Sequence, residues 1–417
     1  MLDQKKIRNS PEEISELLKR RNYTFNLSKW NSLDGKRKKI QIETEDLQSS
    51  LNNLSKQIGI LKGEKKETKH LEKEAALTTK SIKKLSGELV SILEHIEDFL
   101  LDIPNLPDDD VPEGEDESQN KELRKWGRIP KFNFTPKDHV EIGEVSSSID
   151  LESSAIITGS RFMVLKNKYA KLQRSLIQFM MDMHLNKHSY EEVYVPYIVN
   201  RESLVGTGQL PKFEEDLFQI EGNQKFYLSP TAEVPVTNLL RDKIVDSKDL
   251  PIKWVCHTPC FRREAGSYGK DTKGIMRLHQ FEKVELVQAV EPEDSDKALE
   301  ELTCHAEAIL QALEIPYRVV SLCTADLGFS ASKTYDIEAW IPSQNTYREI
   351  SSCTNFRDFQ ARRIKARWKD TSTNKTELLN TINGSGLAIG RTLIALVENH
   401  QTKEGDFKIP EALKNYF

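Results

Sequence analysis

The chain has 417 residues, enough for two or three domains that each bury a hydrophobic core. Charged residues make up 30% of it and hydrophobic residues 37%, and no stretch of 18 apolar residues occurs, which excludes a membrane-spanning helix. The net charge of −5 argues against a protein that coats nucleic acid without selectivity, but it is compatible with a local basic patch.

The beginning of the chain and its cysteines both indicate a cytoplasmic protein. The first residues, MLDQKKIRNS, have neither the apolar segment of a secretory signal nor the Arg-rich, acid-poor character of an organellar presequence. The five cysteines are an odd number, which suits a reducing compartment and predicts no disulfides. CHTPC at 256–260 could bind zinc together with Cys304 and His305, but structural zinc sites normally show two short paired spacings. We therefore expect buried strand cysteines and no zinc.

Residues 40–61 and 71–99 carry apolar side chains at alternating spacings of three and four, the heptad pattern of a coiled coil. The break between them, KGEKKETKH at 62–70, is highly charged and long enough only for a turn. The pattern predicts two long helices that fold back on each other as an antiparallel hairpin.

Basic side chains gather near the two ends of this predicted hairpin. Those proposed to contact phosphates are Lys36 and Arg37 near the base and Lys62, Lys65, Lys66 and Lys69 near the tip. A coiled coil that only mediates dimerisation is the alternative. The concentration of lysines at the tip favours a phosphate-binding arm.

The segment DIPNLPDDDVPEGEDESQN, residues 102–120, is rich in proline, glycine and acidic residues and has no periodicity, as is typical of a linker. We therefore predict a helical arm at 1–105, a linker at 106–125 and a larger domain at 126–417. In the larger domain, the apolar stripe at 161–184 predicts a core helix. The remaining short β-rich segments, joined by loops and hairpins, predict an α+β fold on an antiparallel sheet flanked by helices.

The stretch FRREAGSYGKDTKGIMRLHQFEKVELV, residues 261–287, predicts a hairpin with a polar, glycine-containing loop. If both ends are strands, Arg262 and Glu264 share a face of the first strand. Arg277, Phe281 and Glu285 likewise share a face of the second, at about 13 Å between successive members. Guanidinium groups suit phosphates, a ring suits a base and a carboxylate suits an ammonium. These charges favour a nucleotide joined to an amino acid, although an exposed hairpin with solvated charges is the alternative.

Taken together, these motifs resemble the seryl-tRNA synthetases of the bacterial type, which are class II aminoacyl-tRNA synthetases. The resemblance covers nearly the whole chain and includes the hairpin at 261–287. It is carried further by TGQLPKF (207–213), SPTAEVPVTNLL (229–240), EISSCTNFRDFQARR (349–363) and NGSGLAIGRTLIALVEN (383–399). It implies a tRNA-binding coiled-coil arm followed by a class II catalytic domain.

The resemblance also implies a role for individual side chains. Arg262, Arg277 and Arg391 would be catalytic. ATP would contact Arg262, Arg263, Glu264, Arg277, Phe281, Glu349, Ile350, Ser351, Ser352 and Arg391. Serine would contact Thr231, Ala232, Glu233, Arg262, Glu285, Asn383 and Ser385. Glu349 and Ser352 would hold Mg²⁺.

The implied reaction is activation of L-serine by ATP and transfer of the seryl group to serine tRNA, with selenocysteine tRNA as a further acceptor left open. A homodimer is implied as well, formed through the region around Pro196 and the helix before it. The TAE triplet at 231–233 is typical of the zinc-free form. Two mild departures from the family pattern are Ser189, where a glycine is usual, and Phe356, where a small residue or cysteine is commoner.

Three other functions compete with this interpretation. Intact Arg262, Glu264, Glu285 and Arg391 argue against an inactive paralogue kept for RNA binding. The long basic-tipped arm argues against a ligase that loads an amino acid onto a carrier protein. A pure coiled-coil scaffold would have no use for a site-bearing domain that makes up most of the chain.

Overall fold

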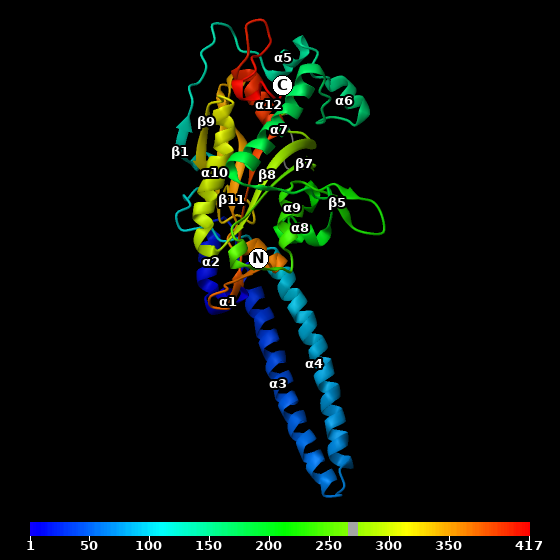
Figure 1. Ribbon diagram of the computed structural model, residues 1–417. Coiled ribbons are helices and arrows are strands. Elements are labelled where there is room, and N and C mark those ends of the chain that lie inside the picture. The colour runs from blue at the N-terminus through cyan, green and yellow to red at the C-terminus, as the bar shows by residue number, and fades with distance from the viewer. Residues whose placement is uncertain (266–273) are drawn as a thin grey trace. The chain divides into compact units, whose positions relative to one another are not determined.

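The architecture is that of a computed structural model in which residues 1–265 and 274–417 are described. The chain forms two compact units (Figure 1). One contains Leu2–Lys19 and Tyr23–Ile103, and the other contains Met1, Arg20–Asn22 and Pro104–Phe417. Within the described ranges, none of the helices has the length and apolar character that a bilayer crossing requires.

The first unit is entirely helical. Its helices are α1 (Gln4–Asn9), α2 (Pro11–Lys19), α3 (Leu27–Gly63) and α4 (Lys69–Leu101). Helices α3 and α4 lie side by side and are joined by a short turn, as Figure 1 shows. The predicted antiparallel hairpin is therefore confirmed, and both helices extend beyond the heptad segments.

Aromatic packing joins the ends of α3 and α4 that lie away from the turn. Trp30 is fully buried, and its ring stacks on Phe99 at 6.2 Å between centroids. Phe25 contacts the same ring at 5.8 Å. Nearer the turn, burial is confined to isolated positions such as Leu54, because two helices alone can cover only a narrow stripe of each other.

The second unit is built on an eight-stranded sheet. The strand order is β1 (Lys121–Trp126), β9 (Tyr317–Ser321), β10 (Lys333–Ile341), β11 (Thr346–Asn355), β14 (Asn380–Ala388), β8 (Gln280–Val290), β7 (Ile252–Phe261) and β2 (Glu191–Glu192). Every neighbouring pair is antiparallel except β2 with β7. This confirms the predicted α+β class with an antiparallel sheet.

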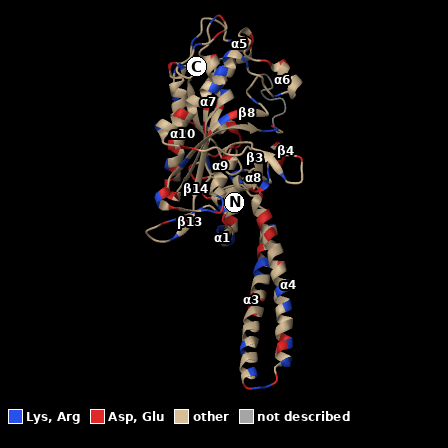
Figure 2. Ribbon diagram, turned by 45° about the vertical axis from the view of Figure 1, so that its right-hand side comes forward, with Lys and Arg blue, Asp and Glu red and all other residues tan. Residues whose placement is uncertain are grey.

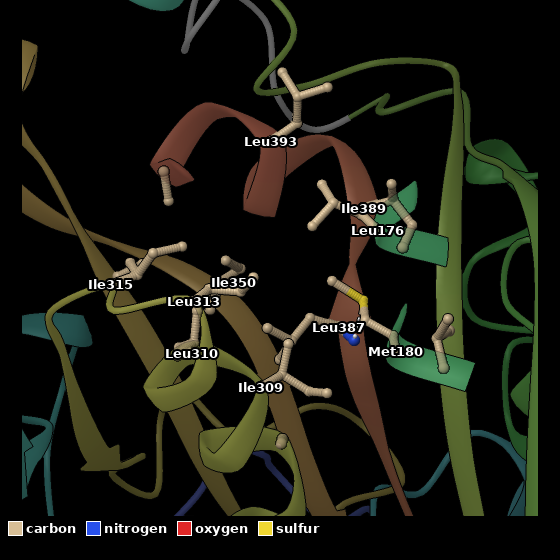
Figure 3. Packing of buried hydrophobic residues seen from close by; sticks show 14 of the residues in the cluster. Leu176, Met180, Ile309, Leu310, Leu313, Ile315, Ile350, Leu387, Ile389 and Leu393 are labelled. Carbon is tan, nitrogen blue, oxygen red and sulfur yellow. Dashed lines mark hydrogen bonds between the residues drawn. The ribbon is translucent and has the colours of Figure 1, made fainter. Parts of the chain in front are cut away.

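Three helices bury the apolar face of this sheet: α7 (Asn167–His188), α10 (Ser295–Ala312) and α12 (Ile389–Asn399). Figure 3 shows their side chains meeting those of the strands, with Met180 of α7 beside Leu387 of β14 and Leu310 of α10 near Ile350 of β11. Val284 on β8 belongs to the same cluster. One face of the central strands is therefore committed to the core, which leaves the other face for ligands.

The helix predicted from the apolar stripe at 161–184 begins later than expected, at Asn167. Leu165 forms a β-bridge with Ile149, and Lys166 has an extended backbone with φ −128° and ψ 168°. The helix cannot include residues whose backbone is already engaged in an extended pairing. At its other end, Ser189 adopts the left-handed conformation with φ 57°, which glycine adopts without strain.

Smaller elements surround the large sheet. Two three-stranded sheets have the orders β13 (Thr376–Leu378), β12 (Arg367–Lys369), β6 (Ile244–Asp246) and β3 (Ile198–Asn200), β5 (Phe226–Leu228), β4 (Gln219–Ile220). The short helices are α5 (His139–Val145), α6 (Leu151–Ile157), α8 (Arg201–Thr207), α9 (Glu233–Thr237) and α11 (Phe359–Ile364). Single 3₁₀ turns lie at Glu117–Gln119, Glu214–Asp216, Asn238–Leu240, Ser247–Asp249, Pro292–Asp294, Pro342–Gln344 and Glu411–Leu413.

The predicted hairpin at 261–287 is present as β7 and β8, but its strands are shorter than expected. Strand β7 ends at Phe261 and β8 begins at Gln280, so Arg262, Glu264 and Arg277 lie outside both strands. Glu264 has φ 51°, a left-handed conformation that a continuing strand does not adopt. The strand alternation inferred for these three residues was therefore wrong. The predicted polar loop lies largely outside the described residues, since 266–273 are not described.

Candidate active site

A cavity of about 390 Å³ opens on the face of the sheet opposite the helices. Strands β8, β11 and β14, the start of α12, and segments 207–213 and 328–331 contribute to its lining. Thirteen of the sequence-predicted site residues line it: Thr231, Glu233, Arg262, Glu264, Arg277, Phe281, Glu285, Glu349, Ile350, Ser352, Asn383, Ser385 and Arg391. The fold thus brings together residues separated by up to 160 positions in the chain.

Three predicted residues do not line the cavity. Ala232 is fully buried in an apolar cluster, and the backbone N–H of Arg263 donates to the carbonyl of Asp216 at 2.9 Å. Ser351 points to the other side of β11, where its hydroxyl donates to the Ser385 carbonyl at 2.6 Å. Alternation between neighbouring residues of β11 explains this, because the next residue, Ser352, takes the cavity side.

Strand β8 presents alternate side chains to the cavity. Phe281, Lys283 and Glu285 line it, whereas Glu282 points away and pairs with His257 at 2.8 Å. The Arg262 guanidinium lies over the Phe281 ring at 5.3 Å from its centroid. A backbone contact steadies this arginine, since its Nε donates to the Pro230 carbonyl at 3.1 Å.

The deep end of the cavity is a buried polar cluster of Thr231, Lys283 and Glu285. Their exposed fractions are 4%, 7% and 2% respectively. The Thr231 hydroxyl donates to Glu285 Oε2 at 2.9 Å, and Lys283 Nζ donates to Thr231 Oγ1 at 2.8 Å while it also pairs with Glu285. Lys283 was not among the residues predicted from the sequence. Its position between Phe281 and Glu285 at strand spacing could have revealed it.

Glu233 is the second carboxyl at this end. Burial raises its pKa to about 7, with a further contribution from the charge of Glu285, and hydrogen bonds from Gln360 and Asn383 oppose the shift. Gln360 of α11 donates to Glu233 Oε1 at 2.6 Å and accepts a bond from the Thr381 hydroxyl at 2.8 Å. Gln360 was not predicted, and no local spacing links it to Glu233, which is 127 positions away.

The opposite end of the cavity is rich in guanidinium groups. The guanidinium of Arg391, on α12, donates to the backbone carbonyl of Glu349 at 3.0 Å. It also pairs with the Glu349 carboxylate at 3.1 Å. The Arg391 charge is the main reason that the Glu349 pKa lies below its usual value. Arg277 and Glu264 form a further contact at 3.4 Å. Cations here and carboxylates at the deep end suit a ligand that is anionic in its middle and cationic at one tip.

Oxygen ligands for a divalent cation lie along β10 and β11. Glu349 and Ser352 line the cavity, and Asp336 pairs opposite Ser352 in the strand register. Burial raises the Asp336 pKa well above its usual value, and the nearby Glu349 charge adds to this. Its Oδ1 is buried, with no hydrogen-bond partner among the described residues. Within residues 1–265 and 274–417, no group of three or more His, Cys, Asp or Glu side chains could hold a metal ion.

The cysteines considered for zinc are dispersed between a strand and a helix. Cys256 and Cys260 are free and buried on β7, and Cys304 is free and exposed on α10. Burial raises the Cys256 pKa to about 12, which opposes the thiolate form that a metal requires. Nothing in their arrangement favours zinc over simple packing.

The predicted RNA-binding side chains lie along α3, α4 and the turn between them, where Figure 2 shows basic and acidic residues interspersed. Arg37 pairs with Asp34 at 2.8 Å. At the tip, Lys62 pairs with Glu72 at 2.8 Å and Lys66 with Glu64 at 2.6 Å.

Comparison with known proteins shows what this combination of arm and cavity represents. The family model described as "Seryl-tRNA synthetase N-terminal domain" matches residues 1–107, and the "tRNA synthetase class II core domain (G, H, P, S and T)" matches residues 213–400. The chain is 53% identical to the serine–tRNA ligase of Hahella chejuensis, covering 100% of this chain and 97% of that protein. The chain belongs to the seryl-tRNA synthetase family.

Other members of this family agree with the assignment along the whole chain. The serine–tRNA ligase of Francisella philomiragia is 54% identical, over 100% of this chain and 98% of that protein. Among solved structures, the seryl-tRNA synthetase of Pyrococcus horikoshii complexed with ATP superposes with a TM-score of 0.93 at 36% identity. That likeness covers 100% of this chain and 98% of the solved chain. Both the arm and the catalytic core of the family are therefore represented.

Proposed function

We propose that the chain activates L-serine with ATP to form seryl-adenylate and pyrophosphate, and then transfers the seryl group to the 3′ end of serine tRNA. It is a class II serine–tRNA ligase. The observation that carries this conclusion is the polarity of one cavity, which has guanidinium groups at one end and buried carboxylates at the other. An aminoacyl-adenylate has the complementary pattern, with phosphate between a base and an ammonium.

The ATP end is assigned as follows. Phe281 stacks on one face of adenine and Arg391 covers the other, while the Glu264 carboxylate accepts from the adenine amino group. Arg277 binds the γ-phosphate, and Arg262 binds the α-phosphate together with the serine carboxylate. Support comes from the positions of these side chains around one cavity and from the Arg262 guanidinium held beside the Phe281 ring.

The serine end is assigned to the buried cluster. Glu285, Thr231 and Glu233 bind the ammonium and hydroxyl of serine, and Asn383 and Ser385 complete the pocket. The environment of Glu285 supports this, because this buried carboxylate already pairs with one ammonium, that of Lys283, and therefore suits another. A pocket of this size and polarity also selects for a small side chain that carries a hydroxyl.

Activation requires no strong general base in this arrangement. An oxygen of the serine carboxylate attacks the α-phosphorus in line, and the bond to the bridging oxygen of pyrophosphate breaks. Arg262, Arg277 and Arg391 stabilise the charge that develops on the phosphoryl groups. Transfer then follows by attack of the terminal ribose hydroxyl of the tRNA on the acyl carbon. The bond from that carbon to the phosphate oxygen breaks, AMP leaves, and the hydroxyl proton is released.

Glu349 and Ser352 would hold Mg²⁺ through their side-chain oxygen atoms, since both line the cavity. Magnesium binds in proteins through one or two carboxylates, with substrate phosphates supplying further ligands. The partly buried carboxyl of Asp336 behind Ser352 is an additional acceptor that a cation nearby would stabilise. Mg²⁺ held there would supply positive charge to the phosphate oxygens.

We also propose that the helical arm binds the tRNA through Lys36, Arg37 and the lysines of its tip, in a cytoplasmic protein divided at 1–105, 106–125 and 126–417. Whether selenocysteine tRNA is a further acceptor is left to a charging assay.

A homodimer through the region around Pro196 is part of this proposal. Tyr194 is 85% exposed and Ile198 is 50% exposed there, which suits a covered interface. Sedimentation at micromolar concentration should give a dimer, and a monomer would contradict it.

Serine-dependent exchange of pyrophosphate into ATP tests the activation step directly. Serine should support exchange, alanine should be rejected by roughly 10⁴ because it leaves buried polar groups unpaired, and threonine should be the closer competitor. Comparable exchange with alanine would refute the assignment of serine. Exchange without charging of serine tRNA would leave activation intact and refute the transfer step.

A further inference from the structure

Lys283 already makes the contacts that the proposed function assigns to the ammonium of serine. Its Nζ donates to Thr231 Oγ1 at 2.8 Å and pairs with Glu285. The Thr231 hydroxyl is fully engaged, since it donates to Glu285 and accepts from Lys283 and from the Glu233 backbone N–H at 3.3 Å. A serine ammonium can take the same positions on Thr231 Oγ1 and Glu285 Oε2 only if Lys283 leaves these two atoms.

Exchange of one ammonium for another is electrostatically inexpensive here. Glu285 is only 2% exposed, so loss of its partner cation without replacement would leave a buried, unpaired carboxylate. When the incoming cation takes the same two acceptors, the charge at the deep end is unchanged. The displaced lysine is then free to use its long, flexible stem to reach another anion.

The position of Lys283 on β8 indicates where that anion lies. The residue sits midway between Phe281, assigned to adenine, and Glu285, assigned to the ammonium, at about 7 Å from each along the strand. In an aminoacyl-adenylate, the group between the base with its ribose and the amino group is the acyl-phosphate. The Arg262 guanidinium lies against the Phe281 ring on the same side of the sheet.

We propose that Lys283 is a catalytic residue of serine activation, whose ammonium is displaced from Thr231 and Glu285 by the substrate and then binds the α-phosphoryl oxygens. This inference rests on the proposed function. The serine carboxylate oxygen forms the new bond to phosphorus, and the bond to the pyrophosphate oxygen breaks. Lys283 donates hydrogen bonds to the charged oxygens and transfers no proton.

A purely structural role makes a different prediction. If Lys283 only holds Thr231 and Glu285 in position, its removal should disorder these acceptors, weaken every amine that binds the deep end and leave turnover at saturating serine unchanged. If the lysine competes with the substrate ammonium, its removal should strengthen binding of an amine that has no carboxylate. Turnover should fall, because the transition state loses a cation.

The test compares Lys283→Met with the parent chain in pyrophosphate exchange at pH 8, using ethanolamine as a competitive inhibitor. Ethanolamine is serine without its carboxylate. We expect kcat to fall by about 10²- to 10³-fold, as when one transition-state donor is removed. The inhibition constant of ethanolamine should fall by about tenfold or more. In the variant, ethanolamine no longer has to displace the Lys283 ammonium from its charged hydrogen bonds. The ATP KM should stay within about threefold of the parent value, because adenine and the γ-phosphate are bound by other residues.

Lys333→Met is the matched control, because Lys333 is similarly buried at 9%, is paired with Asp110 and does not line the cavity. It should leave kcat and ethanolamine inhibition at parental values. If Lys283→Met fails to fold, Lys283→Gln keeps a donor near both acceptors without the charge and should show the same two shifts in smaller degree.

Two results would overturn the inference. One is a kcat within about threefold of the parent in a folded Lys283 variant, and the other is weaker inhibition by ethanolamine in that variant. A parent chain that supports no serine-dependent exchange would instead overturn the proposed function, and this inference with it.

Discussion

The tip of the helical arm offers a test in which two lysine pairs within one turn should behave differently. Lys62 and Lys66 already pair with Glu72 and Glu64. Among the described residues, Lys65 and Lys69 form no ion pair with a carboxylate. The test compares two double variants for binding to serine tRNA. One carries both Lys65→Gln and Lys69→Gln, and the other carries both Lys62→Gln and Lys66→Gln.

The expected magnitude follows from counterion release. Removal of one lysine that binds a phosphate should flatten the dependence of log affinity on log salt by about 0.7 to 0.9. The slope for the Lys65 and Lys69 variant should therefore be shallower by about 1.4 to 1.8 units. Lys62 and Lys66 must first give up their carboxylate partners, so their removal should change the slope by less than about one unit.

Fluorescence anisotropy with labelled serine tRNA, at salt concentrations from about 50 to 200 mM, measures the slope for each variant. Serine-dependent pyrophosphate exchange provides the control and should stay at the parental rate, because the tip contributes no residue to the cavity. The reasoning would be refuted if both double variants kept the parental slope. It would also be refuted if the Lys62 and Lys66 variant showed the larger change.

Four further outcomes are expected. Glu285→Ala should raise the serine KM by roughly 10- to 100-fold, because hydrogen bonds to charged groups contribute about 1.5 to 3 kcal/mol, and it should leave the ATP KM unchanged. An unchanged serine KM in exchange assays would contradict the assignment of Glu285 to the serine pocket. The serine KM should fall as pH rises through about 7, where the Glu233 carboxyl with its raised pKa ionises, and Glu233→Gln should flatten this pH profile. Replacement of residues 38–98 by a short flexible linker should preserve exchange and abolish tRNA charging, and parental charging would show that the arm does not bind tRNA. Ser189→Gly should raise the free energy of unfolding by about 0.5 to 1 kcal/mol, measured by denaturant titration, because glycine adopts the left-handed backbone without strain.

Local patterns in the chain were sufficient to predict its main elements. The heptads at 40–61 and 71–99 predicted α3 and α4, because a sustained spacing of three and four defines a helix face regardless of its partner. The α+β class followed from β-rich segments that lack regular intervening helices. Phe281 and Glu285 were predicted to share a strand face, and β8 presents both to the cavity.

Strand boundaries and helix starts depended on tertiary pairing instead. The sequence from Arg262 to Glu264 reads as a continuation of β7, yet the left-handed backbone at Glu264 ends that possibility. Likewise, α7 begins only at Asn167, because Leu165 is paired with Ile149. Backbone hydrogen bonds to distant segments settle such positions, and these partners are not encoded in local spacing.

The sequence by itself determined the family and most of the residues that line the cavity, since those residues lie in short motifs with recognisable chemistry. Tertiary structure alone decided which of them touch. Gln360 reaches Glu233 from a helix 127 positions away, and Lys283 occupies the acceptors of Thr231 and Glu285. The physical reason is that buried charges must find partners across strands and loops, so their pairing depends on how the whole sheet brings distant segments together.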